Sequence, residues 1–412
     1  MKLEPSDQSE GRPHYFAIDG LRFLCALMVA FHHLFFWSWA SPYTTIGDAG
    51  QIFAGVAQFP SAVWWSWFGW IGVQIFFVIS GFVITNSAVR ASPMQFWAAR
   101  VLRLYPAVWV CATLSLVAQY FIGGISLPDL LGRYVKSMLL VPRPTLYWLD
   151  GAYWSLAVEI TFYALIFLVL ALKRASKIHG LAWLLTISSA VFYAFYLAVE
   201  LQLVTQTDVV LFWRTHQYAL PALLPRYGSL FALGIWLWLA ANERLTVTSR
   251  TGLLLALVGS VIGAYIRTLE TLAVCPAASG QSALIPVLIL LVGILIVAGS
   301  SQGTGNGYSP PGPIRTALTY LGLTSYPLYL IHNTVGVGTS RLLIEAGTNA
   351  WLSNCLVLSG LIAFSWLFCW KAEPVIRSHL RPVIAYAEVR FLRPRKALAF
   401  LFSPPDKSSS SI

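Results

Sequence analysis

Long apolar runs dominate this chain and constrain its fold more than any other feature. About ten runs are roughly 17 to 22 residues long, the length that a helix needs to cross a ~30 Å hydrocarbon core. Charged residues make up only 10% of the chain, whereas soluble domains carry roughly 25%. The ten-residue alternating segments of outer-membrane barrels are not found in the sequence. The chain is therefore predicted to be an all-α, polytopic integral membrane protein. The predicted spans are 16–37, 70–88, 104–122, 152–172, 181–200, 219–240, 252–267, 282–299, 318–337 and 351–370.

The distribution of Lys and Arg predicts how these spans are oriented. Placing the N-terminus in the cytoplasm puts most of the 27 basic residues on the cytoplasmic side, as the positive-inside rule requires. We therefore expect about ten spans with both termini cytoplasmic, and we interpret the net charge of +11 as an orientation signal rather than a sign of nucleic-acid binding. The expected parts are a cytoplasmic segment at 1–15, a membrane domain at 16–372 and a basic cytoplasmic tail at 373–412 that lies on anionic lipid.

Cysteine spacing and the N-terminal segment narrow the class further. The five cysteines are scattered and form no CxxC pair or metal-ligand spacing, so the sequence predicts neither a disulfide framework nor a metal site. The first 13 residues are polar and lead into the first apolar run without a small-residue cleavage site. We therefore expect that run to be a retained span rather than a signal peptide.

The first span carries four ionisable side chains, each a candidate for function because burial at membrane depth is costly. Arg22 and His33 are eleven residues apart, which places them within roughly 20° of one helix face and about 16 Å apart along the axis. This stripe favours a functional His33, although an interfacial histidine in an aromatic belt is the alternative. Asp19 lies about 21 Å from His33 on the same helix, so it is expected to pair with Arg22 or to cap the helix start.

Two further groups of polar residues are candidates. Arg100 and Arg103 are spaced i, i+3 near a membrane surface, where two guanidinium groups suit phosphate, or simply mark the cytoplasmic side. Glu159 lies about two turns into the fourth span, at a depth that allows it to pair with His33, or to act as a polar clamp between helices. Weaker candidates are Arg226, Tyr326 and His332, of which the last two flank a proline that should kink the ninth span.

Five segments resemble, in order and spacing, the landmarks of membrane acyltransferase family 3. They are AIDGLRFLCALMVAFHH, GWIGVQIFFVISGFVIT, FWAARVLRLYPAVWV, YWSLAVEITFYAL and TSYPLYLIH. The resemblance as a whole spans residues 15 to about 375. The family's motifs fall on Asp19 to Arg22, on Arg22 and His33, on Arg100 and Arg103, and on Trp154, Ser155, Leu156 and Glu159. One departure is Gln74, at a position where the family often has an acid.

The resemblance implies a multi-pass enzyme of the inner membrane that transfers a short acyl group, often acetyl, from acyl-CoA to a hydroxyl. Acceptors in the family are usually sugars of surface polysaccharides, lipid-linked glycans or secreted glycosides. Acyl-CoA is then a substrate, and no cofactor is expected to stay bound. The implied catalytic residues are His33, Glu159 and Asp19, the acyl-CoA-binding residues are Arg22, Arg100 and Arg103, and the supporting residues are Arg226, Ser155, Trp154, Tyr326 and His332.

The expected mechanism places the nucleotide of acyl-CoA against the arginines and the thioester near His33. His33 then acts as general base with Glu159 orienting its ring, or as a nucleophile that forms an acyl-imidazole. The sequence leaves both roles open. The main alternative function is a glycolipid or polysaccharide transporter or flippase without acyl transfer, in which the same ionisable residues form a pathway. A membrane scaffold that binds a partner through the basic tail is a further alternative.

Overall fold

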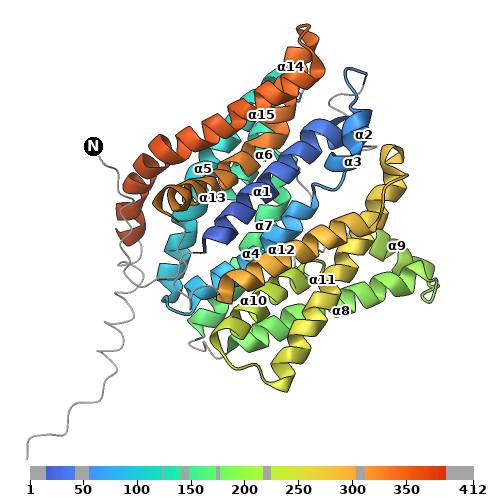
Figure 1. Ribbon diagram of the computed structural model, residues 1–412, viewed down its shortest axis with the longest axis vertical. Helices are drawn as coiled ribbons and strands as arrows, with labels where there is room; N and C mark the ends of the chain where they lie inside the picture. The colour runs from blue at the N-terminus through green and yellow to red at the C-terminus, as the bar shows by residue number, and fades with distance from the viewer. Residues whose placement is uncertain are drawn as a thin grey trace, which may run out of the picture.

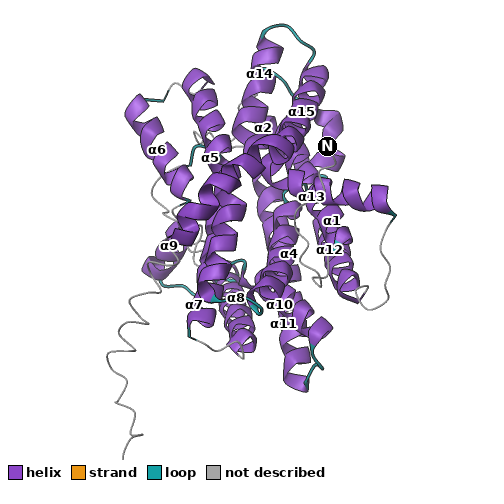
Figure 2. Ribbon diagram, turned by 90° about the vertical axis from the view of Figure 1, so that its left-hand side faces the viewer, coloured by secondary structure: helices purple, strands orange, loops and turns teal. Residues whose placement is uncertain are grey.

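Helices and their connections make up the whole described part of the chain, so the predicted all-α class is confirmed (Figure 2). The computed structural model describes residues 15–41, 55–122, 125–140, 148–172, 177–216, 224–302 and 311–386. Most of the expected N-terminal segment and more than half of the expected tail lie outside the described residues, together with several basic residues that carried the orientation argument.

The elements follow one another along the chain as helices of very different length. The α-helices are α1 (Phe16–His32), α2 (Ser38–Ala40), α3 (Val63–Ser66), α4 (Ile71–Ala88), α5 (Pro93–Ile122), α6 (Leu127–Leu139), α7 (Trp154–Ala171), α8 (Ile178–Glu200), α9 (Thr207–His216), α10 (Gly228–Asn242), α11 (Val247–Val274), α12 (Leu284–Gln302), α13 (Gly312–Ile331), α14 (Gly338–Glu345) and α15 (Ala350–Leu367). The short 3₁₀ and π turns are η1 (His33–Trp37), η2 (Pro60–Ala62), η3 (Gly151–Tyr153), η6 (Pro276–Ala278), η8 (His332–Val337) and η9 (Phe368–Ala372).

Seven helical stretches of the described chain are long and apolar enough to cross a membrane. They are Phe16–Ala40, Pro60–Ala88, Pro93–Phe121, Gly151–Ala171, Ile178–Glu200, Val247–Val274 and Ala350–Tyr386. Two shorter apolar helices, α10 and α12, and the helix α13 occupy the described parts of the remaining predicted ranges. The protein is thus a multi-pass membrane protein, while the count of ten spans and the cytoplasmic termini stay predictions.

The structure differs from the expected element boundaries in three places. Helix α5 begins at Pro93 and not near 104, so Arg100 and Arg103 lie within the helix. Helix α11 is continuous for 28 residues and extends beyond both ends of the predicted span 252–267. The last span does not end near 370, because helix continues through η9 to residue 386 and buries Glu373. An apolar helix therefore extends into the segment expected to be a tail.

Helices α1 and α4 lie in the middle of the fold, between a flank of α13, α14 and α15 and a flank of α8, α10 and α11 (Figure 1). A close backbone contact joins α4 to α10 at Gly81 and Gly234. A Cβ on Gly81 would lie 2.2 Å from the Phe231 carbonyl oxygen, and one on Gly234 would lie 2.2 Å from the Val78 carbonyl oxygen. Because membrane helices gain little from apolar burial, such close backbone packing of small residues holds them together.

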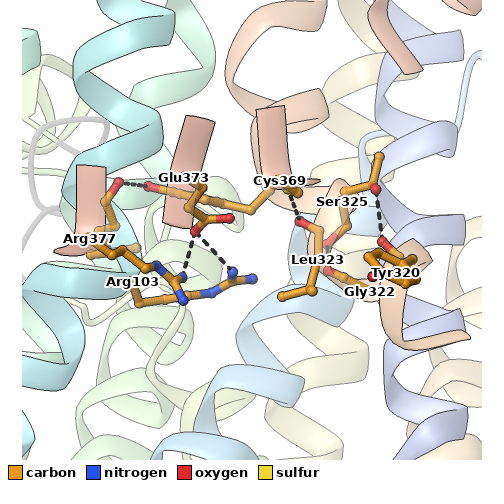
Figure 3. A network of polar contacts seen from close by, with 11 residues as sticks. Arg103, Tyr320, Gly322, Leu323, Ser325, Cys369, Glu373 and Arg377 are labelled. Atoms are coloured by element: carbon orange, nitrogen blue, oxygen red, sulfur yellow. Dashed lines mark hydrogen bonds and ion pairs between the residues drawn. The ribbon is translucent and has the colours of Figure 1, made fainter. Parts of the chain in front are cut away.

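Proline and π turns shape the two helices that reach the centre of the fold. Helix α13 continues through Pro327, which cannot donate to the carbonyl of Leu323 four residues earlier. That carbonyl instead accepts from the Cys369 thiol at 3.5 Å (Figure 3). The π-helical turn η8 begins at His332, and a second π-helical turn, η1, begins at His33. Such turns inside α-helices are frequent at functional sites, and here η1 and η8 pack against each other.

Candidate active site

A cavity rich in arginine lies among α1, α4, α5, α7 and α13. It contains about 790 Å³ of space, its open mouth included. We call it the arginine cavity because three guanidinium groups contribute to its wall. The polar and aromatic residues of the wall include Arg22, Arg100, Arg103, Glu159, Tyr163 and Tyr326. Every residue predicted to bind acyl-CoA therefore lies in one place.

A second cavity, of about 770 Å³, lies on the other side of a thin wall. We call it the histidine cavity because it exposes the rings of two consecutive histidines at the end of α1. Its wall includes His32, His33, Trp70, Gln74, Trp154 and Arg267. Val73 of α4 and Tyr329 of α13 border both cavities. The predicted stripe on α1 thus extends from Arg22 in one cavity to His33 in the other.

Tyr329 lies in the wall between the cavities, where its hydroxyl is held by hydrogen bonds. Its hydroxyl lies 2.7 Å from the Ser155 hydroxyl and 3.2 Å from the Ala152 carbonyl oxygen. The Ser155 hydroxyl lies 3.1 Å from the same carbonyl oxygen, so one hydroxyl donates to Ala152 and the other donates to its neighbouring hydroxyl. The ring of Phe76 packs edge-on against the tyrosine ring. The predicted supporting residue Ser155 therefore holds Tyr329 at the boundary between the two cavities.

The ring of His332 lies against the ring of His33, with the ring centroids 4.8 Å apart. His332 Nδ1 lies 2.7 Å from the Tyr329 carbonyl oxygen, which can only accept, so this nitrogen carries the proton. The other nitrogen of the neutral ring, Nε2, is then an acceptor, and it lies 3.1 Å from His33 Nδ1. His33 Nδ1 also lies 2.9 Å from the Val29 carbonyl. Both contacts require a donor, so the lone pair of the neutral His33 ring is on Nε2.

The structure does not bring Glu159 to His33, in contrast to the pair expected from their depths. Glu159 borders the arginine cavity, where it accepts hydrogen bonds from Ser80 and Tyr163. The reason lies in the register of α7. Ser155 is level with the wall, and Glu159 follows one turn later, about 6 Å further along the helix and beyond the wall. The expected pair assumed that Glu159 and His33 lie at the same depth in the membrane, whereas α1 and α7 are offset along their axes.

A carboxylate outside the predicted site residues holds Arg103 in the arginine cavity. Glu373, which is only 4% exposed, lies 3.8 Å from Arg103 and also accepts from Arg377 (Figure 3). Arg103 further lies over the ring of Tyr326, 5.6 Å from its centroid. The sequence placed Glu373 in the tail, so this partner was not expected. Its contact with Arg377 compensates part of its charge and leaves the cavity with an excess of guanidinium groups.

Arg100 is the cation of this cavity with an unsatisfied donor. Its guanidinium lies 5.6 Å from the Phe96 ring centroid and 5.9 Å from that of Tyr163. Its Nε is buried and makes no hydrogen bond to any of the described residues. A buried guanidinium donor without an acceptor costs free energy, which an anion entering the cavity would recover. Arg100 is therefore well placed to bind a ligand phosphate.

Asp19 and Arg226, both predicted to contribute, border neither cavity. Asp19 packs against α13, where a Cβ on Gly322 would lie 2.6 Å from its carboxylate, and it interacts electrostatically with Arg22. Its predicted pairing with Arg22 agrees with this position, and its predicted catalytic role stays a prediction. Arg226 is 4% exposed and binds Glu270, which also lies 3.4 Å from Arg267. Arg226 therefore does not border the histidine cavity but contacts Glu270, the partner of the cavity residue Arg267.

Arg267 and Gln74 are two cavity residues that were not among the predicted site residues. Arg267 lies in the long apolar helix α11. The i, i+3 pair of Arg267 and Glu270 inside a long apolar helix was the signal available, because ionisable residues at such depth are functional candidates. Gln74 was noted only as a departure from the family pattern, although it borders the histidine cavity.

Asp150, at the start of η3, connects the wall to the turn that carries His332. Its carboxylate accepts from the Ala152 backbone at 2.8 Å, from the Asn333 side chain at 3.0 Å and from the Thr334 backbone at 2.8 Å. Burial raises the pKa of Asp150 to about 6, against the smaller opposing effect of these hydrogen bonds. The carboxylate fixes η3 to η8 and so helps to position His332.

This raised pKa predicts a pH dependence of stability. Between about pH 4 and pH 6 the folded protein holds a proton on Asp150 that the unfolded chain releases, so the free energy of unfolding decreases as pH rises through this window and is level above it. Asp150→Asn removes the titration. The difference in stability between wild type and variant should fall by up to about 3 kcal/mol across the window, measured by thermal unfolding in detergent. A difference that stays constant with pH would contradict this, and Asp208→Asn on the exposed side of α9 is the matched control.

The chain was compared with known proteins. A family model described as an acyltransferase domain matches residues 15–370. Nodulation protein 10 of Rhizobium leguminosarum bv. viciae is 28% identical over 199 residues, which are 43% of this chain and 50% of that protein. Peptidoglycan O-acetyltransferase OatA of Listeria monocytogenes serovar 1/2a is 30% identical over 179 residues, which are 38% of this chain and 24% of that protein.

A third relative covers more of both chains. The exopolysaccharide production protein ExoZ of Rhizobium meliloti is 28% identical over 330 residues, which are 75% of this chain and 90% of that protein. The chain spans half the length of the nodulation protein and about a quarter of OatA. No solved structure matches the chain. Since the family model covers the helices that form both cavities, the chain belongs to acyltransferase family 3.

Proposed function

We propose that this protein transfers a short acyl group, acetyl in the simplest case, from acyl-CoA to a hydroxyl of a sugar in a surface polysaccharide, a lipid-linked glycan or a glycoside. The observation that carries the proposal is the pair of cavities that share Val73 and Tyr329. One cavity presents guanidinium groups suited to a polyanionic donor, and the other presents a histidine whose lone pair lies on Nε2. The family and the names of the relatives agree with an acyltransferase.

The predicted topology places the donor and the acceptor on opposite sides of the membrane. With the N-terminus of α1 in the cytoplasm of a bacterial-type cell, the arginine cavity belongs to the cytoplasmic half of an inner-membrane protein, where acyl-CoA is available. The charged nucleotide cannot enter lipid, so it docks at Arg22, Arg100 and Arg103. The uncharged pantetheine arm then brings the thioester to the wall at Tyr329, and the acceptor sugar enters the histidine cavity from the other side.

The transfer itself needs one base and no bound cofactor. His33 Nε2 removes the proton of the acceptor hydroxyl as its oxygen attacks the thioester carbonyl. The C–S bond breaks, CoA leaves as a thiolate, and the imidazolium returns the proton to this sulfur. His332 accepts from His33 Nδ1 throughout, so it fixes the tautomer and stabilises the imidazolium. His332 thus takes the orienting role that was predicted for Glu159, which instead interacts with Arg22 in the arginine cavity.

The test uses the purified protein in lipid nanodiscs with radiolabelled acetyl-CoA and a pooled glycan fraction from the source cell. We expect label in the glycan that mild alkali releases, as an O-ester requires. A second sample without glycan checks the mechanism, because an acyl-imidazole intermediate would label the protein itself whereas a general base would not. Absence of both acetyl-CoA binding and glycan labelling would overturn the proposal and favour a transporter.

A further inference from the structure

Two residues that border the histidine cavity each have a buried polar atom without a partner among the described residues. Gln74, only 5% exposed, has no hydrogen-bond partner at Oε1, and Trp70 has none at Nε1. The two residues are one turn apart on the same face at the start of α4, and both border the cavity. Unpaired buried donors and acceptors are rare and costly, so these atoms point to a ligand that supplies both an acceptor and a donor. A sugar hydroxyl can do both.

The same cavity offers an aromatic wall beside these atoms. The rings of Trp154 and Tyr227 lie 5.4 Å apart at 35°, and both residues border the cavity. Flat aromatic faces of this kind bind the apolar faces of a ring-shaped polyol, while its hydroxyls bond to polar groups at the edge. The wall therefore has the chemistry expected for a pyranose ring.

The charge of the cavity restricts the sugar further. Arg267 borders it, 5.9 Å from the ring centroid of Trp70, and none of the described residues in its wall is a carboxylate. The nearby carboxylate of Glu270 binds Arg267, but it also binds the buried Arg226. One carboxylate between two guanidinium groups leaves an excess of positive charge. Gln74 adds none of the negative charge that would offset it.

We propose that the histidine cavity selects an acceptor sugar that carries an acidic group, either a uronic acid carboxylate or a sugar phosphate. Arg267 binds the anion through its guanidinium. Trp70 and Gln74 bind hydroxyls, and the ring rests on Trp154, which leaves the hydroxyl to be acylated near His33. This inference rests on the proposed function, because it names the class of acceptor for the same site.

The experiment measures sugar binding without an acyl donor, by equilibrium dialysis of the full-length protein in nanodiscs. The probes are 4-methylumbelliferyl β-D-glucuronide, the corresponding glucoside, and the glucoside 6-phosphate. Wild type should bind at least one anionic probe roughly tenfold more tightly than the glucoside. The stronger of the two anionic probes identifies whether the natural group is a carboxylate or a phosphate. Equal binding of all three probes would overturn the proposal.

Two substitutions test whether the preference for anionic probes arises at the histidine cavity. Arg267→Gln should remove it by weakening binding of the anionic probe roughly tenfold while binding of the glucoside stays the same. Gln74→Glu should also remove the preference, because it adds a carboxylate of similar shape next to the bound anion. Arg341→Gln, at a surface pair with Glu345, is the matched control and should retain the preference. A preference that persists in both cavity variants would contradict the assignment.

The outcome separates this inference from the proposed function. Acetyl transfer to a glycan pool without any anionic preference would leave the acyltransferase proposal standing and refute the acidic acceptor. A preference that depends on Arg267, in a protein that transfers no acetyl group, would support the acidic ligand and refute acyl transfer.

Discussion

Replacement of His33 by alanine is expected to lower the rate of acetyl transfer by roughly 10²- to 10⁴-fold, the usual contribution of a general base. Binding of acetyl-CoA should stay within about twofold, because His33 borders the histidine cavity and the guanidinium groups lie in the other one. The two readouts are single-turnover transfer of radiolabel and equilibrium binding of acetyl-CoA. His179→Ala, a partly exposed histidine that pairs with Glu243, is the matched control and should leave both unchanged.

A second variant distinguishes the base from the residue that orients it. His332→Ala should lower kcat less than His33→Ala does and should leave the KM for acetyl-CoA unchanged, because His332 acts only through His33 Nδ1. Transfer that survives in His33→Ala would refute the assignment of the base. Loss of acetyl-CoA binding in that variant would show that the two cavities do not work separately.

Replacement of Arg100 by glutamine is expected to weaken acetyl-CoA binding by roughly 10- to 100-fold. Its Nε is buried without a partner in the described structure, so a phosphate that binds there gains a full charge-assisted hydrogen bond. Arg103 is a poorer choice for this test, because its removal would leave the buried Glu373 with one partner fewer. Arg90→Gln, an exposed arginine just before α5, is the matched control.

A comparison of two acyl donors tests more strictly whether Arg100 binds phosphate. Acetylpantetheine carries the same thioester and arm as acetyl-CoA but lacks the nucleotide phosphates. Arg100→Gln should therefore raise the KM for acetyl-CoA and leave the KM for acetylpantetheine unchanged. An equal effect on both donors would place Arg100 at the arm or in the packing of α5 and would contradict phosphate binding.

Local pattern was sufficient to predict the helices and one face of the site. Each apolar run predicted a helix because hydrophobic length is a property of the run itself. The stripe from Arg22 to His33 was predicted equally well, since both residues lie on one rigid helix and its geometry fixes their relation. In α11 the predicted span was shorter than the helix, in which Gly252 and Gly263 pack against Trp236 and Tyr193.

Contacts between helices could not be predicted in the same way. Ser155 and Tyr329 are 174 positions apart, and His33 and His332 are 299 apart, so their contact depends on how separate helices slide and tilt against one another. For that reason the expected Glu159–His33 pair is not found in the structure: Glu159 borders the arginine cavity, and His33 borders the histidine cavity. Glu373 was not expected because the helix that carries it extends further than its hydropathy suggests.

The wall at Val73 and Tyr329 has an electrical consequence in the proposed orientation. The acyl group leaves the CoA thiolate as a formal cation and moves outward, while the proton released by the acceptor moves inward to the same sulfur. One positive charge therefore moves in each direction, and each turnover carries no net charge across the insulating layer. The equilibrium of the transfer is then independent of the membrane potential. The thioester alone would drive the modification of a glycan outside the cell.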